Sequence, residues 1–236
     1  MKRNRKTIKQ RATKLIIALD VDNFNAAKKI VDLLYPKVKI FKVGLQLFLA
    51  TGNKIIRYIK RKGGLVFLDL KFYDIPNTVA AACRETVRLG ADMFTVHSQG
   101  GLDMLIAAKQ AVDEESRRLK KQAPLVLGVT VLTSKGRESN IKQRVLGLAR
   151  EASKAGLDGI VCAGQEVKIA RKKIGDNFII VTPGIRLEDQ EKQDQRRTAT
   201  PKQTKQAGSN YLVVGRPIIK AKHPLKVVEK ILADIK

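Results

Sequence analysis

The charged residues between Asp69 and Asp74 are the ones whose types and spacing best suit chemistry. The segment reads Asp-Leu-Lys-Phe-Tyr-Asp, and Lys42 follows another apolar stretch. Side chains two apart in a strand share a face, so Asp69 and Lys71 are expected to point the same way. A protonated lysine aimed into a cavity can protonate a developing carbanion, and a carboxylate held beside an anionic substrate group destabilises that group. The alternative is a salt-bridge network that only closes the fold.

A second candidate site is the turn Gly215-Arg216-Pro217, which follows an apolar run. Pro217 suits the first turn of a short helix. Backbone N–H groups and the Arg216 guanidinium would together bind a phosphate. Arg186 and the polar residues up to Gln195 are expected to close over the same ligand. The sequence has no Walker loop and no GxGxxG motif, so neither a nucleoside triphosphate nor a dinucleotide is indicated.

The elements that must position these residues alternate between strand and helix. Stretches with helical spacing separate short β-branched or Leu-rich runs, and glycines before several runs are typical helix stops. The runs predicted as strands are Lys14–Leu19, Val38–Val43, Leu65–Leu70, Met93–Val96, Leu125–Val129, Gly159–Cys162, Phe178–Thr182 and Tyr211–Val214.

This alternation predicts parallel pairing through right-handed crossovers, with both faces of the sheet covered. A doubly wound sheet usually opens with a glycine-rich turn, whereas residues 20–24 after the first run contain no glycine. We therefore expect an α/β fold with a single-domain (β/α)8 TIM barrel, and keep the doubly wound sheet as the alternative. Residues 1–13 are predicted to be a basic N-terminal arm and 14–236 the catalytic barrel. Its active site is expected at the C-terminal ends of the strands.

The composition narrows the class of protein. The 236 residues include 47 Lys+Arg against 22 Asp+Glu, a formal net charge of +25, and 44% are hydrophobic. No nucleic-acid motif accompanies the charge, so weak, nonspecific nucleic-acid binding is all that the charge predicts. No apolar run approaches the roughly 18 residues that a membrane-spanning helix requires. After the basic start, the apolar run from Leu15 to Leu19 is too short for a signal-peptide h-region of roughly 7–15 residues. We therefore expect a cytoplasmic protein with no membrane contact. Cys83 and Cys162 are expected to be reduced packing residues.

From Leu15 to about Lys220 the chain resembles the orotidine 5′-phosphate decarboxylases, which form uridine monophosphate in pyrimidine biosynthesis. Six motifs carry this resemblance. The stretch from Asp69 to Thr78 is the most specific. The motifs are Ile17-Ala18-Leu19-Asp20, Lys42-Val43-Gly44, Asp69-Leu70-Lys71-Phe72-Tyr73-Asp74-Ile75-Pro76-Asn77-Thr78, Val129-Thr130-Val131-Leu132-Thr133-Ser134, Thr182-Pro183-Gly184-Ile185-Arg186 and Val214-Gly215-Arg216-Pro217-Ile218.

The resemblance implies a homodimer that needs no cofactor and no metal, with orotidine 5′-phosphate as substrate. Lys71 would protonate C6 of the pyrimidine after carbon dioxide leaves, and Asp69 would lie against the departing carboxylate. Lys42 and Asp74 would complete an alternating row of charges, with Asp74 supplied by the neighbouring subunit.

The resemblance also implies how the substrate is held. Positions on the rim and in the loops would each contact one part of the nucleotide. These are Asp20 and Lys42 at the ribose hydroxyls, Thr133 at the base, Gln195 between base and phosphate, Arg186, Gly215 and Arg216 at the phosphate, and Ile75 and Thr78 from the neighbouring subunit.

Two rival functions remain at this point. Sugar-phosphate relatives such as hexulose-phosphate synthase share the Asp-x-Lys-x-x-Asp segment but hold magnesium with an acidic residue where this chain has Lys42. A cation there would repel a divalent metal. The other rival is a basic nucleic-acid-binding barrel with a vestigial site. His97, after the fourth run, is expected to be structural, because protonation by a lysine requires no histidine, and His223 has no evident role.

Overall fold

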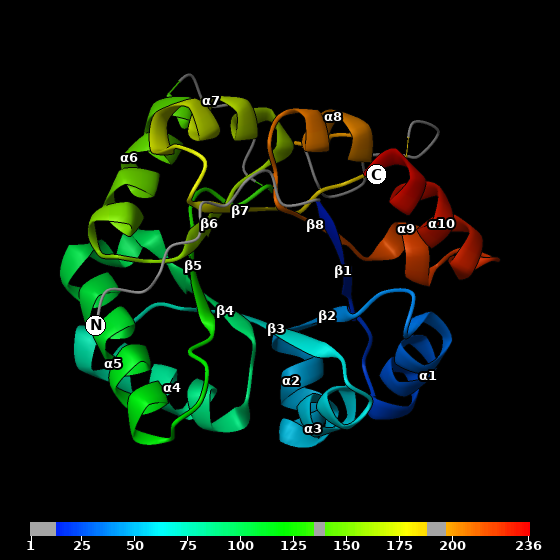
Figure 1. The fold of residues 1–236 in the computed structure, drawn as a ribbon, viewed down its shortest axis with the longest axis horizontal. Coiled ribbons are helices and arrows are strands. Elements are labelled where there is room, and N and C mark those ends of the chain that lie inside the picture. Colours follow the sequence, from blue (N-terminus) through cyan, green and yellow to red (C-terminus); the bar gives the residue numbers. More distant parts are fainter. Residues whose placement is uncertain (1–12, 135–139, 188–196) are drawn as a thin grey trace.

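The computed structural model describes residues 13–134, 140–187 and 197–236. In this part of the chain, parallel strands form one closed barrel in chain order, as Figure 1 shows. The first strand pairs with both the second and the last, which confirms the predicted barrel and makes the doubly wound alternative wrong. The strands are β1 (Lys14–Ala18), β2 (Ile40–Gly44), β3 (Leu65–Phe72), β4 (Met93–His97), β5 (Leu125–Val129), β6 (Gly159–Val161), β7 (Ile179–Thr182) and β8 (Tyr211–Val214).

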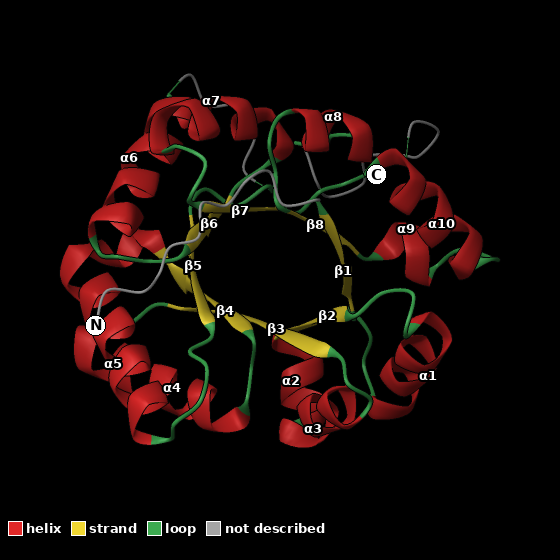
Figure 2. Cartoon of the chain, in the orientation of Figure 1, coloured by secondary structure: helices red, strands yellow, loops and turns green. Residues whose placement is uncertain are grey.

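Helices surround the barrel as an outer ring (Figure 2). Most fill the connection between one strand and the next, as right-handed crossovers require. They are α1 (Phe24–Leu34), α2 (Leu45–Thr51), α3 (Asn53–Arg61), α4 (Pro76–Leu89), the 3₁₀ turn η1 (Ser98–Gly100), α5 (Gly101–Arg118), α6 (Ile141–Lys154), α7 (Gly164–Ile174), α8 (Pro201–Gln206), α9 (Arg216–Ile219) and α10 (Pro224–Asp234).

The strands are apolar on both faces because they separate two cores. Along β1, Leu15 and Ile17 belong to the core shared with the helices, whereas Ile16 and Ala18 belong to the barrel interior. The period-two alternation of a strand produces this division. The interior core consists of Ile16, Ala18, Ile40, Phe67, Met93, Leu127, Val181 and Val213.

Strand β3 ends later than predicted. It runs to Phe72 rather than Leu70, so Asp69 and Lys71 both lie within it. Its pairing with β4 is interrupted between Leu68 and Phe72. Lys71 has a φ of 53°, in the left-handed region that non-glycine residues rarely adopt. The strand therefore bends where it carries its charged residues.

A predicted helix stop is confirmed at the end of α4. Gly90 adopts a left-handed conformation with a φ of 81°, and its N–H donates to the carbonyls of Thr86 and Val87. A residue with a side chain would be strained in this conformation. The cap turns the chain from α4 back toward β4.

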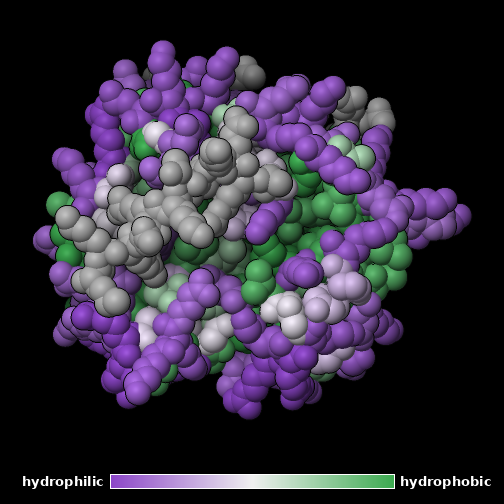
Figure 3. All heavy atoms as spheres, in the orientation of Figure 1, coloured by the Kyte–Doolittle hydropathy of each residue, from purple (hydrophilic) through white to green (hydrophobic). Residues whose placement is uncertain are grey.

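The face in view in Figure 3 is largely hydrophilic, and both cysteines are buried. Figure 3 shows hydrophilic side chains over most of the face in view, with hydrophobic ones gathered toward its middle. Cys83 and Cys162 are free and buried, as expected. Among the described residues, no helix is long and apolar enough to cross a membrane. Most of the predicted N-terminal arm, residues 1–12, lies outside the described residues.

Candidate active site

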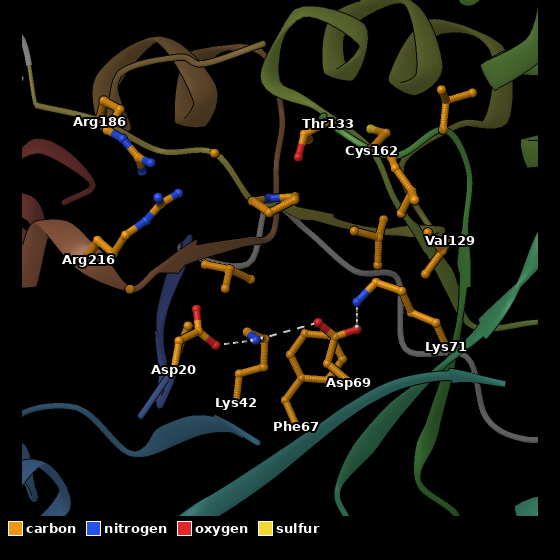
Figure 4. A pocket seen from close by; sticks show the side chains of 18 residues that line it. Asp20, Lys42, Phe67, Asp69, Lys71, Val129, Thr133, Cys162, Arg186 and Arg216 are labelled. Carbon is orange, nitrogen blue, oxygen red and sulfur yellow. Dashed lines mark hydrogen bonds and ion pairs between the residues drawn. The ribbon is translucent and has the colours of Figure 1, made fainter. Parts of the chain in front are cut away.

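Four side chains of alternating charge line one side of a pocket at the C-terminal ends of the strands (Figure 4). Asp20 follows β1, Lys42 is on β2, and Asp69 and Lys71 are on β3. Lys42 Nζ donates to Asp20 Oδ1 at 3.0 Å and lies 3.6 Å from Asp69 Oδ2. Lys71 Nζ donates to the other oxygen, Asp69 Oδ1, at 2.9 Å. We call these four residues the charge chain.

Burial and charge act in opposite directions on the middle of the charge chain. The side chains of Lys42 and Asp69 are only 12% and 14% exposed. Burial disfavours the charged form of Asp69, but Lys42 and Lys71 outweigh it and hold the pKa of this carboxyl below its ordinary value. Burial likewise opposes the charge of Lys42, but Asp69 and Asp20 raise its pKa. Both groups are therefore charged at neutral pH.

Local backbone geometry brings Asp69 and Lys71 together. The period-two rule correctly predicted that both would face the pocket, but Lys71 does so from a left-handed backbone conformation. Its N–H donates to Thr95 Oγ1 at 2.9 Å instead of to a carbonyl of β4. Thr95 Oγ1 also lies 3.0 Å from Asp69 Oδ1. Sequence reasoning missed Thr95, since a threonine inside an apolar strand gives no sign of its partner.

The opposite side of the pocket carries two arginines. Arg186 follows β7 and Arg216 opens α9, and Figure 4 shows both guanidinium groups extending into the pocket. Between them and β1 lies Gly215, where an added Cβ would come within 3.2 Å of Ala18 Cβ and of Asp20 Oδ2. Glycine therefore lets the turn after β8 approach the end of β1. The predicted anion-binding turn lies in the same pocket as the charge chain.

Thr133 and an apolar wall complete the pocket. Thr133, for which the family resemblance implies a contact with the base, lies beyond the end of β5 and lines the pocket. The wall presents side chains with little capacity to solvate an anion. Its members include Phe67, Val129, Val131, Cys162, Pro183 and Val213. The pocket thus has a side of alternating charge, a cationic side and an apolar wall, which suits an anionic ligand that also carries a less polar part.

Three predicted site residues of the described chain do not line this pocket. Asp74, Ile75 and Thr78 are exposed beyond the end of β3 and in the first turn of α4. The Asp74 carboxylate accepts a hydrogen bond from the N–H of Ile75 at 2.6 Å and is not among the residues that line the pocket with the charge chain. Gln195 lies outside the described residues.

A buried ion pair joins the loops behind the pocket. Arg197, which precedes α8, donates from Nη1 to Glu166 Oε1 in α7 at 2.7 Å. Its Nη2 donates to the carbonyls of Val131 and Leu132 at 3.0 and 2.8 Å. Sequence reasoning missed this pair as well, because charged residues in polar stretches are usually solvated.

His97 contacts two residues near the end of β4 and is not part of the charge chain. The His97 ring stacks on Tyr73 at 5.4 Å between centroids, and its Nδ1 accepts from the N–H of Gln99. These contacts agree with a structural role.

Within the residues described, no three His, Cys, Asp or Glu side chains form a group suited to a metal ion. The Lys42 ammonium occupies the space between two carboxylates, so this donor set does not fit a divalent cation.

Comparison with known proteins gives a consistent result. The family model described as "Orotidine 5'-phosphate decarboxylase / HUMPS family" matches residues 13–231. The orotidine 5'-phosphate decarboxylase of Moorella thermoacetica is 46% identical over 231 residues, covering 94% of this chain and 92% of the relative. That of Legionella pneumophila (strain Paris) is 45% identical over 230 residues, with coverages of 94% and 99%. The crystal structure of orotidine 5'-phosphate decarboxylase from Lactobacillus acidophilus has a TM-score of 0.83 at 37% identity, covering 95% and 99% of the two chains.

Proposed function

We propose that this chain, which belongs to the orotidine 5'-phosphate decarboxylase / HUMPS family, uses its charge chain to expel a carboxylate and protonate the carbon left behind. Its activity is the decarboxylation of orotidine 5'-phosphate to uridine 5'-phosphate in de novo pyrimidine biosynthesis, which makes it a carboxy-lyase. The observation that supports the mechanism is the contact of Lys71 with a buried, ionised Asp69 in the pocket.

Substrate orientation in this proposal follows from the two ends of the pocket. The phosphate binds between Arg186, Arg216 and the backbone of Gly215, because guanidinium groups match phosphate oxygens. The base then points toward Asp69 and Lys71 on the opposite side. Asp20 and Lys42 bind the ribose hydroxyls and Thr133 contacts the base, and Gln195 is proposed to bridge base and phosphate.

Carbon–carbon cleavage is assisted by repulsion and followed by proton transfer. Asp69 lies against the substrate carboxylate, and two like charges in a partly dehydrated pocket repel each other. The bond from C6 to the carboxylate breaks, carbon dioxide leaves beside the apolar wall, and the electron pair stays on C6. The Lys71 ammonium donates its proton to that carbanion, and solvent restores the proton to the lysine.

The proposal includes a homodimer with shared active sites. Asp74, Ile75 and Thr78 of one subunit are proposed to reach the site of its partner, where Asp74 extends the row of charges. Exposed apolar side chains support such an interface, since Ile75 beside Asp74 is 67% exposed and Leu49 in α2 is 83% exposed. A second copy that covers them would remove their apolar surface from water.

A subunit-mixing experiment tests the shared site. Lys71→Ala and Asp74→Ala variants are each expected to be inactive as homodimers. If the two are unfolded, mixed in equal amounts and refolded together, half of the dimers combine both chains and each has one intact site, so activity returns to about one quarter of wild type. Absence of recovery, with dimers present by light scattering, would contradict a shared site. The assay is the fall in ultraviolet absorbance on loss of the carboxylate, run with and without EDTA, which is expected to change nothing.

Three further proposals rest on the composition and the pathway. We propose a single catalytic barrel over 14–236 preceded by a basic arm, and a cytoplasmic location suited to nucleotide synthesis. We also propose that the net charge of +25 causes only weak, salt-sensitive adhesion to nucleic acid. Filter binding at rising salt concentrations tests the last of these, and affinity that persists at high salt would contradict it.

A further inference from the structure

The pairing of β3 with β4 skips residues where the two charged residues of β3 lie. Leu68 pairs with Phe94, and the next pair is Phe72 with Val96. Strand β3 therefore advances four positions while β4 advances two. Thr95 is the only residue of β4 opposite the interval that holds Asp69 and Lys71.

The Thr95 hydroxyl bonds to both charged residues at once. It accepts a hydrogen bond from the Lys71 N–H at 2.9 Å. A backbone amide can only donate, so the single hydroxyl proton is left for Asp69 Oδ1, 3.0 Å away. Asp69 Oδ1 also accepts from Lys71 Nζ at 2.9 Å. The hydroxyl thus closes a ring that contains the carboxylate of one residue and both nitrogens of the other.

Two features show that this ring constrains geometry. Thr95 is only 1% exposed, so water does not replace its hydrogen bonds. Lys71 has a φ of 53°, a conformation that persists only where the surroundings hold it in place. The Thr95 hydroxyl bonds directly to the N–H of that residue and so fixes the bend from which the ammonium extends.

We propose that Thr95 is a positioning residue of the decarboxylation, which sets the Asp69 carboxylate and the Lys71 ammonium in their reactive arrangement through one hydroxyl. The inference rests on the proposed catalytic roles of Asp69 and Lys71. It differs from a role in packing alone, because packing needs the methyl group of Thr95 and positioning needs the hydroxyl.

The test compares Thr95→Val, which keeps the shape and loses the hydroxyl, with Thr95→Ser, which keeps the hydroxyl and loses the methyl group. Hydrogen bonds to charged groups have strengths that correspond to roughly 10- to 100-fold in rate, so we expect Thr95→Val to lower kcat by about that factor. Its KM should change little, since phosphate and ribose contacts remain. Thr95→Ser is expected to keep kcat within about threefold of wild type.

The pH profile gives a readout that packing would not change. Without a donor from Thr95 the Asp69 carboxylate is less stabilised, so the acid limb of kcat/KM should move to higher pH in Thr95→Val and stay in place in Thr95→Ser. Thr86 offers a matched control, because it is also 1% exposed and its hydroxyl donates to the Ala82 carbonyl in α4. Thr86→Val is expected to leave kcat unchanged.

Each outcome decides the question. Turnover by folded Thr95→Val within twofold of wild type, or equal losses in the valine and serine variants, would overturn the positioning role. If Thr95→Val does not fold by circular dichroism, the serine variant and Thr95→Ala at low temperature carry the comparison, and alanine must then be at least tenfold slower than serine. Lys71→Ala in the same assay separates the positioning role of Thr95 from the proposed catalytic site on which it rests. Activity in that variant would reject the proposed catalytic site itself, whatever Thr95 does.

Discussion

Replacing Arg197 by methionine should destabilise the loops behind the active site. Arg197 and Glu166 are 1% and 2% exposed, and they join at 2.7 Å. The guanidinium also bonds to the carbonyls of Val131 and Leu132, just before Thr133. Arg197 therefore connects the segment after β7 to the loop after β5 and to the first turn of α7. The substitution keeps the apolar volume of the side chain but leaves the Glu166 carboxylate buried without a cation.

The size of the effect follows from that unpaired charge. Removing one partner of a buried ion pair costs about 3–5 kcal/mol. For a domain of this size each kcal/mol shifts Tm by roughly 2–4 °C, so the variant should melt about 6–20 °C lower. Burial already raises the pKa of Glu166 against the influence of Arg197. Without Arg197 the carboxyl should take up a proton more readily, so the loss of stability should be smaller at pH 5 than at pH 8.

Thermal unfolding followed by circular dichroism measures this at both pH values. The double variant Glu166→Met with Arg197→Met removes both charges and should recover much of the loss. Since the loops that hold Thr133 and Arg186 would be less well fixed, KM should rise in Arg197→Met. A Tm within about 2 °C of wild type, or single effects that simply add in the double variant, would refute the reasoning.

Three shorter predictions concern the pocket itself. Lys71→Ala should abolish turnover but retain affinity for nucleotide, because a proton donor acts only after the substrate has bound. The absorbance assay measures the turnover, and calorimetric titration with uridine monophosphate measures the affinity. Arg216→Ala should raise KM by about 10- to 100-fold for the phosphorylated substrate but not for orotidine, and equal effects on the two would contradict a phosphate contact. The pH profile of kcat/KM should show no ionisation of Asp69 or Lys42 near neutrality. Asp69 has a pKa below the ordinary 3.8, so its contribution is present above that value and is lost only as the pH falls further. Lys42 has a pKa above the ordinary 10.5, so its contribution is present below that value and is lost only as the pH rises further. An Asp69→Asn variant that retains the wild-type pH profile would argue against assigning the acid limb to Asp69.

The barrel was predictable because its strands carry their own signal. Leu125–Val129 and Tyr211–Val214 have the predicted bounds, since apolar runs that separate two cores stand out from the helices around them. The charged rim was predictable for a related reason, because polar residues that end successive parallel strands meet at one end of the barrel.

Other features depend on contacts between residues far apart in the sequence. The end of β3 was placed too early because Thr95, on the next strand, accepts the N–H that keeps residue 71 in the strand. The pairing of Arg197 with Glu166 spans 31 positions, and neither residue lies in a motif. The proposed role of Asp74 in a partner's site would depend on a second copy of the chain.

Lys42 explains how Asp69 can be buried and still carry the negative charge that the proposed mechanism requires. A carboxylate alone in such a pocket would take a proton and lose the charge that the proposed mechanism needs. An ammonium 3.6 Å from one oxygen and the Lys71 ammonium 2.9 Å from the other keep it ionised. An acidic residue at the position of Lys42 would instead favour a divalent cation there, which would draw Asp69 into metal coordination. With a lysine there, the carboxylate keeps its charge and is not drawn into a metal site. The second lysine that stabilises it, Lys71, is also the proposed proton donor.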